Sequence, residues 1–368
     1  MKKIIIILIL LPLLSLKSFA NSPLDDLYRQ FNVEELIEII PEQTAEISEN
    51  MLSDDISIEN LISLTPYQLY KVVKEQALKY ISQYRLELFS IISAVLIMAL
   101  FGGIWEIEKQ NEIYDLICVI SITAITVRPI LNCISHCCNS IRDITKFMTA
   151  YIPIYASVMT ASGSVSAAAF YQTIVFAASQ IINQLSVSFF MPILHGYMLL
   201  SLTGSISKNS GIIGLCDGIK KLITWSLTLI STTFTAILSF QSIYGSATDS
   251  AFSKTAKFLV GSFVPIIGSA FADAVSAVNG SIKIIRAAVG GLGIAVATIG
   301  FLPVLINITI LRIILWFTKM IGDSLTVNQI KNLISGFSNV LSIVMALVLT
   351  SIMLLVISTA IMMTTAAI

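Results

Sequence analysis

The chain has 368 residues; 56% are hydrophobic, only 12% are charged, and 22 basic residues balance 22 acidic ones. Because soluble domains carry roughly a quarter charged residues, this composition excludes an ordinary soluble globular protein and predicts an all-α, polytopic helical membrane protein. No basic cluster is large enough to neutralise many phosphates, so nucleic-acid binding is excluded as well.

Residues 1–20 have the pattern of a secretory signal peptide. Lys2 and Lys3 form the charged region, Ile4–Leu16 the apolar run, and Ser18-Phe19-Ala20 a small-x-small cleavage site. The apolar run is short for a span, which needs about 20 residues, so cleavage is predicted and an uncleaved signal anchor is the alternative. In either case the chain from Asn21 onward is expected outside the cytoplasm, in a multi-pass protein of the cell membrane.

Residues 21–87 are predicted to form a small, acidic, helical extracytoplasmic segment. Leu36, Ile37 and Ile40 have helical spacing before Pro41 ends that helix. Further on, Thr65-Pro66 has the pattern of a capping residue followed by the first helical position. The apolar side of the segment is expected to pack either on the membrane body of the same chain or on another protein.

Residues 88–140 are predicted to hold two transmembrane helices and a connection. The spans are Leu88–Ile104 and Ile113–Leu131, and a polar amphipathic connection follows over Asn132–Lys146.

Three cysteines and a histidine gather in this connection, at Cys133, His136, Cys137 and Cys138. Structural zinc sites usually draw on two separated ligand pairs, and the only other histidine, His195, lies far along the chain. The cluster is therefore predicted to be structural, with disulfide formation left open, and we expect neither a metal nor another cofactor.

The rest of the chain has the pattern of an internal duplication with an offset of about 111 residues. Unit one is placed at 141–250 and unit two at 251–361, each with apolar segments separated by Gly and Pro. Three ordered matches align Lys146-Phe147-Met148 with Lys257-Phe258-Leu259, Phe190-Met191-Pro192 with Phe301-Leu302-Pro303, and Ile219-Lys220-Lys221 with Ile330-Lys331-Asn332. The repeat prolines are Pro153 and Pro192 in the first unit and Pro265 and Pro303 in the second. An even number of crossings makes the units parallel, and a re-entrant segment makes them inverted.

Three ionisable residues at membrane depth are the candidate pore or coupling residues, namely Asp273, Arg312 and Arg128. Asp273 either faces a cavity or partner, or lies near a loop and pairs with Lys283 or Arg286. Arg312 is expected to face protein, and Arg128 to extend its charged end toward the interface from the end of a span. The count of crossings puts Lys283 and Arg286 in a cytoplasmic connection.

Two stretches of small residues, 161–167 and 290–293, suit either close helix packing or a pore lining, and packing is the preferred interpretation. The chain has two histidines, no HExxH motif and no phosphate loop, so no catalytic constellation is found and an enzyme is not expected.

The chain resembles the stage III sporulation protein AE family of endospore-forming Firmicutes. The resemblance rests on the layout of signal peptide, acidic helical segment and polytopic body. It is closest over Ala256–Asp273, where Lys257-Phe258 precedes Phe263-Val264-Pro265-Ile266-Ile267-Gly268 and then Asp273-Ala274.

This resemblance implies a permease-like or export-gate-like component of the channel that bridges mother cell and forespore after engulfment, located in the mother-cell membrane around the forespore. Implied partners are membrane lipid, ring proteins in the space between the membranes, and a cytoplasmic secretion-type ATPase. The residues alone leave two alternatives open. One is a stand-alone ion-coupled secondary transporter that uses Asp273, and the other is a non-conducting membrane scaffold.

Overall fold

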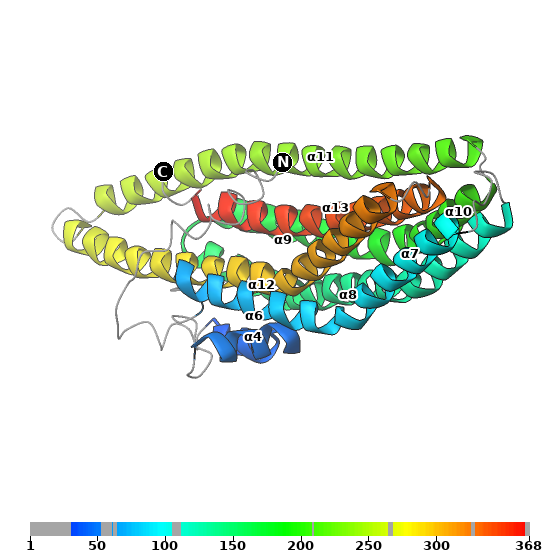
Figure 1. Cartoon of the computed structure of the whole chain (residues 1–368). Coiled ribbons are helices and arrows are strands. Elements are labelled where there is room, and N and C mark those ends of the chain that lie inside the picture. The colour runs from blue at the N-terminus through cyan, green and yellow to red at the C-terminus, as the bar shows by residue number, and fades with distance from the viewer. Residues whose placement is uncertain are drawn as a thin grey trace.

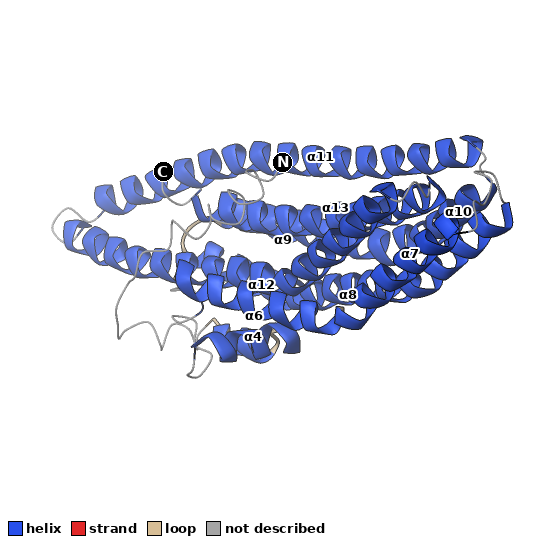
Figure 2. Ribbon diagram, in the orientation of Figure 1, coloured by secondary structure: helices blue, strands red, loops and turns tan. Residues whose placement is uncertain are grey.

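The computed structural model describes residues 31–52, 61, 65–104, 112–207, 210–263, 268–324 and 328–364. Figure 2 shows helices throughout these ranges and no strand, so the all-α prediction is confirmed. The predicted signal peptide and the repeat proline Pro265 lie outside the described residues.

Three short helices precede the long ones: α3 (Val33–Glu38), α4 (Glu42–Leu52) and α6 (Pro66–Gln83). α3 ends before Pro41, as predicted. At the start of α6 the Gln68 N–H donates to the Thr65 hydroxyl at 3.3 Å, and the Thr65 N–H donates to Gln68 Oε1 at 2.8 Å. This capping box satisfies two N–H groups that lack partners within the helix, so the predicted start of α6 is confirmed.

The short helices lie against the long ones, as Figure 1 shows for α4 and α6. α4 and α6 contact α12 (Gly268–Ser324), and α3 contacts α8 (Glu112–Ala161). Leu36 of α3 and Val72 of α6 are buried in these contacts. The membrane body of the same chain therefore covers part of this apolar side, while Val73 and Leu78 of α6 remain exposed and packing on another protein stays a prediction.

Tyr84 separates α6 from α7 (Arg85–Ile104), and the chain bends by 50° there. The Tyr84 hydroxyl donates to Oδ1 of Asn307 on α12 at 2.7 Å, and both side chains are buried. A buried amide needs such a partner, so this hydrogen bond ties the bend between α6 and α7 to α12.

α8 is one helix of 50 residues. It joins the predicted second span, the predicted connection and the first apolar segment of unit one, so the expected breaks between them do not occur. The connection continues the helix because Cys133, Cys137 and Ile141 recur at helical spacing and are buried. Pro129 and Pro153 lie inside α8, where packing against neighbouring helices maintains the turns that a proline weakens.

A second helical run also differs from the expected segments. α9 (Val165–Gln184), the π-helical turn η2 (Leu185–Phe190) and α10 (Met191–Ser207) follow one another without a break. The apolar segments expected on either side of Pro192 are therefore continuous, as are those around Pro303 in α12. In an apolar environment, unwinding a turn leaves further backbone groups without partners, which favours continuing the helix through the proline.

α11 (Ser210–Phe263) and α13 (Asn328–Thr364) complete the bundle. Figure 1 shows the long helices side by side in alternating directions, with α10 and α11 meeting toward the same end of the bundle as α12 and α13. The pair α10–α11 thus runs in the same direction as the pair α12–α13, which the parallel form of the predicted duplication requires. The duplication itself remains a prediction.

Within the described ranges, five helical runs are long and apolar enough to cross a membrane, or six if α6 and α7 form one bent span. They are Leu116–Ala161, Val165–Ser207, Gly211–Ala251, Ile282–Ile321 and Ile330–Met363. This confirms a membrane protein, with fewer and longer runs than the predicted segments. The 43 residues of Val165–Ser207 extend over about 65 Å, roughly twice the hydrocarbon thickness of a bilayer.

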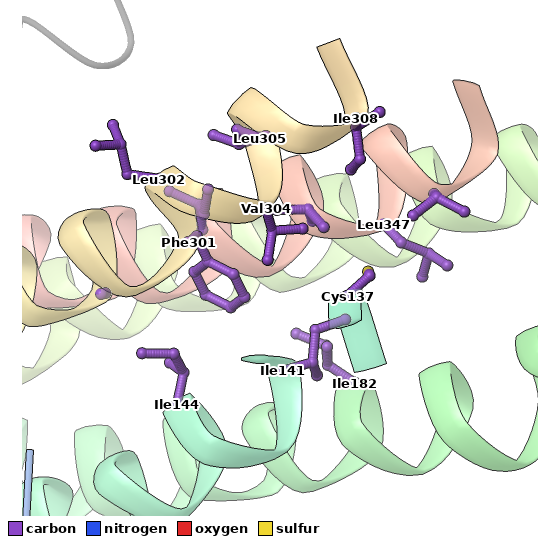
Figure 3. Close-up of a cluster of buried hydrophobic side chains, with 14 of the residues drawn as sticks. Cys137, Ile141, Ile144, Ile182, Phe301, Leu302, Val304, Leu305, Ile308 and Leu347 are labelled. Atoms are coloured by element: carbon purple, nitrogen blue, oxygen red, sulfur yellow. The ribbon is translucent and has the colours of Figure 1, made fainter. Parts of the chain in front are cut away.

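The centre of the bundle is packed from α8, α9, α12 and α13. Figure 3 shows Phe301 of α12 pointing toward α8, where Ile141 and Ile144 lie. Leu347 of α13 and Ile182 of α9 belong to the same buried cluster. This cluster holds α8, α9, α12 and α13 together, and these helices carry the buried arginine and the hydroxyl groups described next.

Candidate functional site in the helical bundle

Arg286 is the most deeply buried charged residue among the described ones, with 1% of its surface exposed. It lies on α12, and its Nη1 donates to the hydroxyls of Ser162 at 3.2 Å and Ser164 at 2.7 Å. Its Nη2 donates to the carbonyl oxygen of Met362 near the end of α13. One guanidinium group therefore joins α12, the α8–α9 turn and α13.

The α8–α9 turn has the sequence needed for this contact. Gly163 has a φ of 85°, a left-handed conformation that favours glycine, and it reverses the chain between the two serines. Ser162 and Ser164 consequently stand on either side of the reversal and both reach Arg286. The predicted stretch of small residues thus forms a turn that supplies hydroxyl groups to a cation.

The cytoplasmic side expected for Arg286 remains a prediction, but the break between apolar segments that was expected just before it does not occur. The residue lies inside the candidate span Ile282–Ile321, because α12 is continuous where the prediction separated two segments. The sequence does contain a signal that was missed. Arg286 is the last charge before a long uncharged stretch that ends at Arg312, and such an isolated charge needs a partner within the protein.

Aromatic side chains extend from Arg286 along α8. Phe147, Tyr151 and Tyr155 stack in sequence with ring centroids 5.6 Å apart at each step, and Tyr171 of α9 meets Tyr155 edge-on at 5.1 Å. The Tyr151 hydroxyl donates to the Val289 carbonyl at 3.1 Å. This column fills the space between α8, α9 and α12 with rigid rings.

The second stretch of small residues packs against this column. A Cβ atom at Gly293 would collide with the ring of Tyr151, and one at Gly290 would collide with Met363. Gly290–Gly293 therefore allows α12 to approach α8 and α13 closely, which agrees with the packing interpretation and not with a pore lining.

The other predicted arginines differ in their surroundings. Arg312 of α12 is half-buried, and its Nη1 lies 3.3 Å from the sulfur of Met345 on α13, so it faces protein as predicted. Arg128 of α8 is exposed next to the buried Pro129, and no ion pair of Arg128 occurs within the described ranges. The structure thus places the two predicted arginines in unlike environments.

Asp273 lies within α12, but its side chain is outside the described part of the structure. Its role as a coupling residue remains a prediction. Of the repeat prolines, Pro153 and Pro192 are exposed while Pro303 is buried in the centre of the bundle.

A second cation binds across helices at the other end of the bundle. Lys220 of α11 donates from Nζ to Oδ1 of Asn339 on α13 at 2.7 Å. One turn before Asn339, Gly336 approaches Ser201 of α10 so closely that a Cβ atom would collide with it. α10, α11 and α13 are therefore held together near Asn339.

A small void lies in the described part of the bundle between α8, α9, α12 and α13. This void of about 10 Å³ lies among Ile144, Thr145, Ser179, Phe301 and Ser351, and this volume suits a single water molecule. The hydroxyls of Thr145, Ser179 and Ser351 bond to backbone carbonyls of their own helices. The void is thus bordered by hydroxyl groups that already have hydrogen-bond partners.

The cysteine cluster lies in the wall of α8. Cys133, Cys137 and Cys138 are buried free thiols. His136 Nε2 lies 3.3 Å from Nε2 of Gln43 on α4. Within the described ranges no group of three His, Cys, Asp or Glu side chains is arranged to hold a metal ion.

Comparison with known proteins gives the family. Residues 47–366 match the family model of stage III sporulation protein AE. A Bacillus subtilis (strain 168) protein named stage III sporulation protein AE is 26% identical over 163 residues, which is 44% of this chain and 41% of that relative. No solved structure matches. Because the family model covers most of the sequence, the chain belongs to the stage III sporulation protein AE family.

Proposed function

We propose that this protein is the permease-like membrane component of a channel complex between mother cell and forespore, required for endospore development after engulfment. The observation that carries the proposal is the family match over residues 47–366, together with five helical runs able to cross a membrane. A sporulation protein with this membrane body suits transport or anchoring in a developing cell. Its sequence contains no recognised catalytic motif that would favour an enzyme instead.

The outer surface of α3 and α4 supports the proposal that a partner protein binds in the space between the membranes. Exposed glutamates there are Glu34, Glu35, Glu38, Glu42, Glu46 and Glu49. An acidic surface favours a basic partner and steers its approach over a Debye length of about 8 Å at physiological salt. A ring protein with a basic surface would suit this position if α3 and α4 lie outside the cytoplasm, as the predicted signal peptide requires.

The small central void bears on how such a complex would conduct. A void of about 10 Å³ at the centre admits no metabolite. Conduction would therefore need a path between several copies, or an opened state in which the contacts around Arg286 or Asn339 separate. The same observation favours a second candidate function, a non-conducting scaffold that anchors the other channel proteins.

Deletion of the gene in its spore-forming host tests the sporulation role. Membrane staining and a late forespore reporter would be scored over time, with the intact gene at another locus as the control. We expect engulfment to finish, the forespore to shrink and the reporter to remain silent. Normal spores would exclude the proposed function.

A second experiment separates conduction from scaffolding. The variant Glu35→Lys/Glu38→Lys/Glu42→Lys reverses charge on the outer surface, and Lys71→Glu/Lys74→Glu on α6 is the control on another exposed surface. Pull-down of the other channel proteins, including the secretion-type ATPase, would be compared with the reporter. If the subunit conducts, a substitution inside the bundle such as Arg312→Gln should lower reporter activity while the other channel proteins are still recruited. If it is a scaffold, reporter activity should fall only when recruitment falls.

A further inference from the structure

A groove runs along the outside of the bundle between the antiparallel helices α9 and α11. Its apolar part has a volume of about 450 Å³ and is lined by residues such as Ala177 and Ile181 of α9 and Thr233 and Ile237 of α11. Volumes of roughly 300–1,000 Å³ are typical of small-molecule sites. The groove is therefore large enough for a ligand and is not only a gap between helices.

The groove changes in polarity along its length. Toward the start of α9 a second hollow of about 560 Å³ continues between the same two helices, and its lining includes Ser166, Gln241, Tyr244 and Thr248. The Oε1 atom of Gln241 is buried and has no hydrogen-bond partner among the described residues. A buried amide oxygen without a partner is unfavourable, and because Gln241 lines this hollow, a rotation of its side chain would bring the oxygen to a ligand that donates a hydrogen bond.

The helices on both sides are uncharged over long stretches. Val165–Ser207 contains no Asp, Glu, Lys or Arg, and neither does Leu222–Thr248 of α11. Since Val165–Ser207 is about twice as long as a bilayer core is thick, part of this surface lies near the interface, where bulk hydrocarbon does not cover it. An apolar groove in that position is stabilised by an occupant that is apolar at one end and polar at the other.

We propose that the α9–α11 groove binds a membrane phospholipid, with one acyl chain along Ala177 and Thr233 and a hydrogen-bond-donating headgroup at Gln241. The apolar part accommodates the chain, and the Gln241 oxygen accepts a hydrogen bond from an ammonium or hydroxyl group of the headgroup. Phosphatidylethanolamine and phosphatidylglycerol carry such donors, whereas phosphatidylcholine does not. Asp249 lies beyond this end, where it caps α9 by accepting the N–H groups of Ser166 and Ala167.

The test uses the full-length protein in phosphatidylcholine nanodiscs that contain a trace of phosphatidylethanolamine with a photoactivatable acyl chain. Ala177→Trp fills the apolar part of the groove. Ala236→Trp is the matched control, because Ala236 is an exposed alanine of α11 outside the groove lining. We expect labels to concentrate on α9 and α11 and to fall about tenfold in Ala177→Trp but not in Ala236→Trp, since a bulky side chain displaces the acyl chain.

A headgroup measurement completes the test. In the wild type, unlabelled phosphatidylethanolamine should compete for the site better than phosphatidylcholine, and Gln241→Leu should remove that preference while labelling persists. If both tryptophan variants label like wild type, with labels spread over all lipid-facing helices, the groove holds only annular lipid and the proposal fails. Disulfide formation between two chains carrying Ala177→Cys would identify a second copy as the occupant and would also overturn it. Should Ala177→Trp not accumulate in the membrane, Thr233→Phe on α11 replaces it.

Discussion

The guanidinium of Arg286 donates to the Ser164 hydroxyl at 2.7 Å, although 122 residues separate them in the sequence. Together with Ser162 and the Met362 carbonyl, this bond closes one end of the bundle around a buried cation. Burying a charge is unfavourable unless hydrogen bonds compensate it, and here the α8–α9 turn and α13 supply them. The contact therefore requires α8, α9, α12 and α13 to be in place together.

Replacing Arg286 by Met is expected to destabilise the bundle by about 3 kcal/mol, because two hydroxyls and a carbonyl lose a charged donor. Arg286→Lys should be intermediate, since an ammonium cannot reproduce the fork of a guanidinium. Lys283→Met is the control, as Lys283 is exposed one turn earlier on α12. The five free cysteines that include Cys118 and Cys216 are all buried, so a thiol-reactive dye reports unfolding during heating. Equal midpoints for the Arg286 and Lys283 variants would refute this role.

Gly336→Ala is expected to weaken the contact between α10 and α13. The added methyl group collides with Ser201, and such overpacking destabilises by roughly 1–3 kcal/mol. Gly196→Ala on α10 meets nothing within 4 Å and should be neutral or stabilising by up to about 1 kcal/mol through helix propensity. Adding Ser201→Gly to Gly336→Ala should recover part of the loss in the same thermal assay. No recovery in the double variant would mean that the collision with Ser201 is not the cause.

Tyr84→Phe should destabilise by about 1–3 kcal/mol, because it leaves the buried Asn307 amide without its hydrogen bond. Tyr67→Phe is the matched control, since Tyr67 is 75% exposed on α6. The double variant Tyr84→Phe/Asn307→Leu removes both polar groups and should be more stable than Tyr84→Phe alone. Unfolding midpoints of Tyr84→Phe, Asn307→Leu and the double variant measure the coupling, and additive effects would argue against it.

Arg312→Gln and Arg128→Gln should separate a functional charge from an exposed one. Arg312 is half-buried beside Met345, whereas Arg128 is exposed. We expect Arg312→Gln to reduce late forespore reporter activity at an unchanged protein level in the membrane, and Arg128→Gln to support normal sporulation. If both variants sporulate normally, Arg312 has no role in coupling or conduction.

Local signals in the sequence predicted local structure well. Thr65-Pro66 was enough to predict where α6 begins, because a helix cap depends only on residues within one turn. The membrane class follows equally from composition, since the shortage of charge is a property of the chain as a whole. Neither prediction required knowledge of the contacts between helices.

Other features depend on contacts distant in sequence. Whether Pro303 ends a helix is decided by the neighbours that surround it, so the run through α12 was not foreseen. The partners of Arg286 were not foreseen either, because the serines that bind it lie in another part of the chain. The family resemblance over Ala256–Asp273 was informative in a different way, since it identified the family without defining the geometry of the site.

The π-helical turn η2 has a consequence for how α9 and α10 share one axis. The buried residues Ile182, Ser186, Phe190 and Leu194 follow one another at intervals of four. At about 100° per residue, three such steps in an α-helix would rotate the inward side by about 120°. The wider π turn absorbs this rotation, so Ser201 still meets Gly336 on α13. The rotational phase of α10 is thus set by one turn, and deleting a single residue there would convert the turn to regular α-helix while the contact residues of α10 keep their direction.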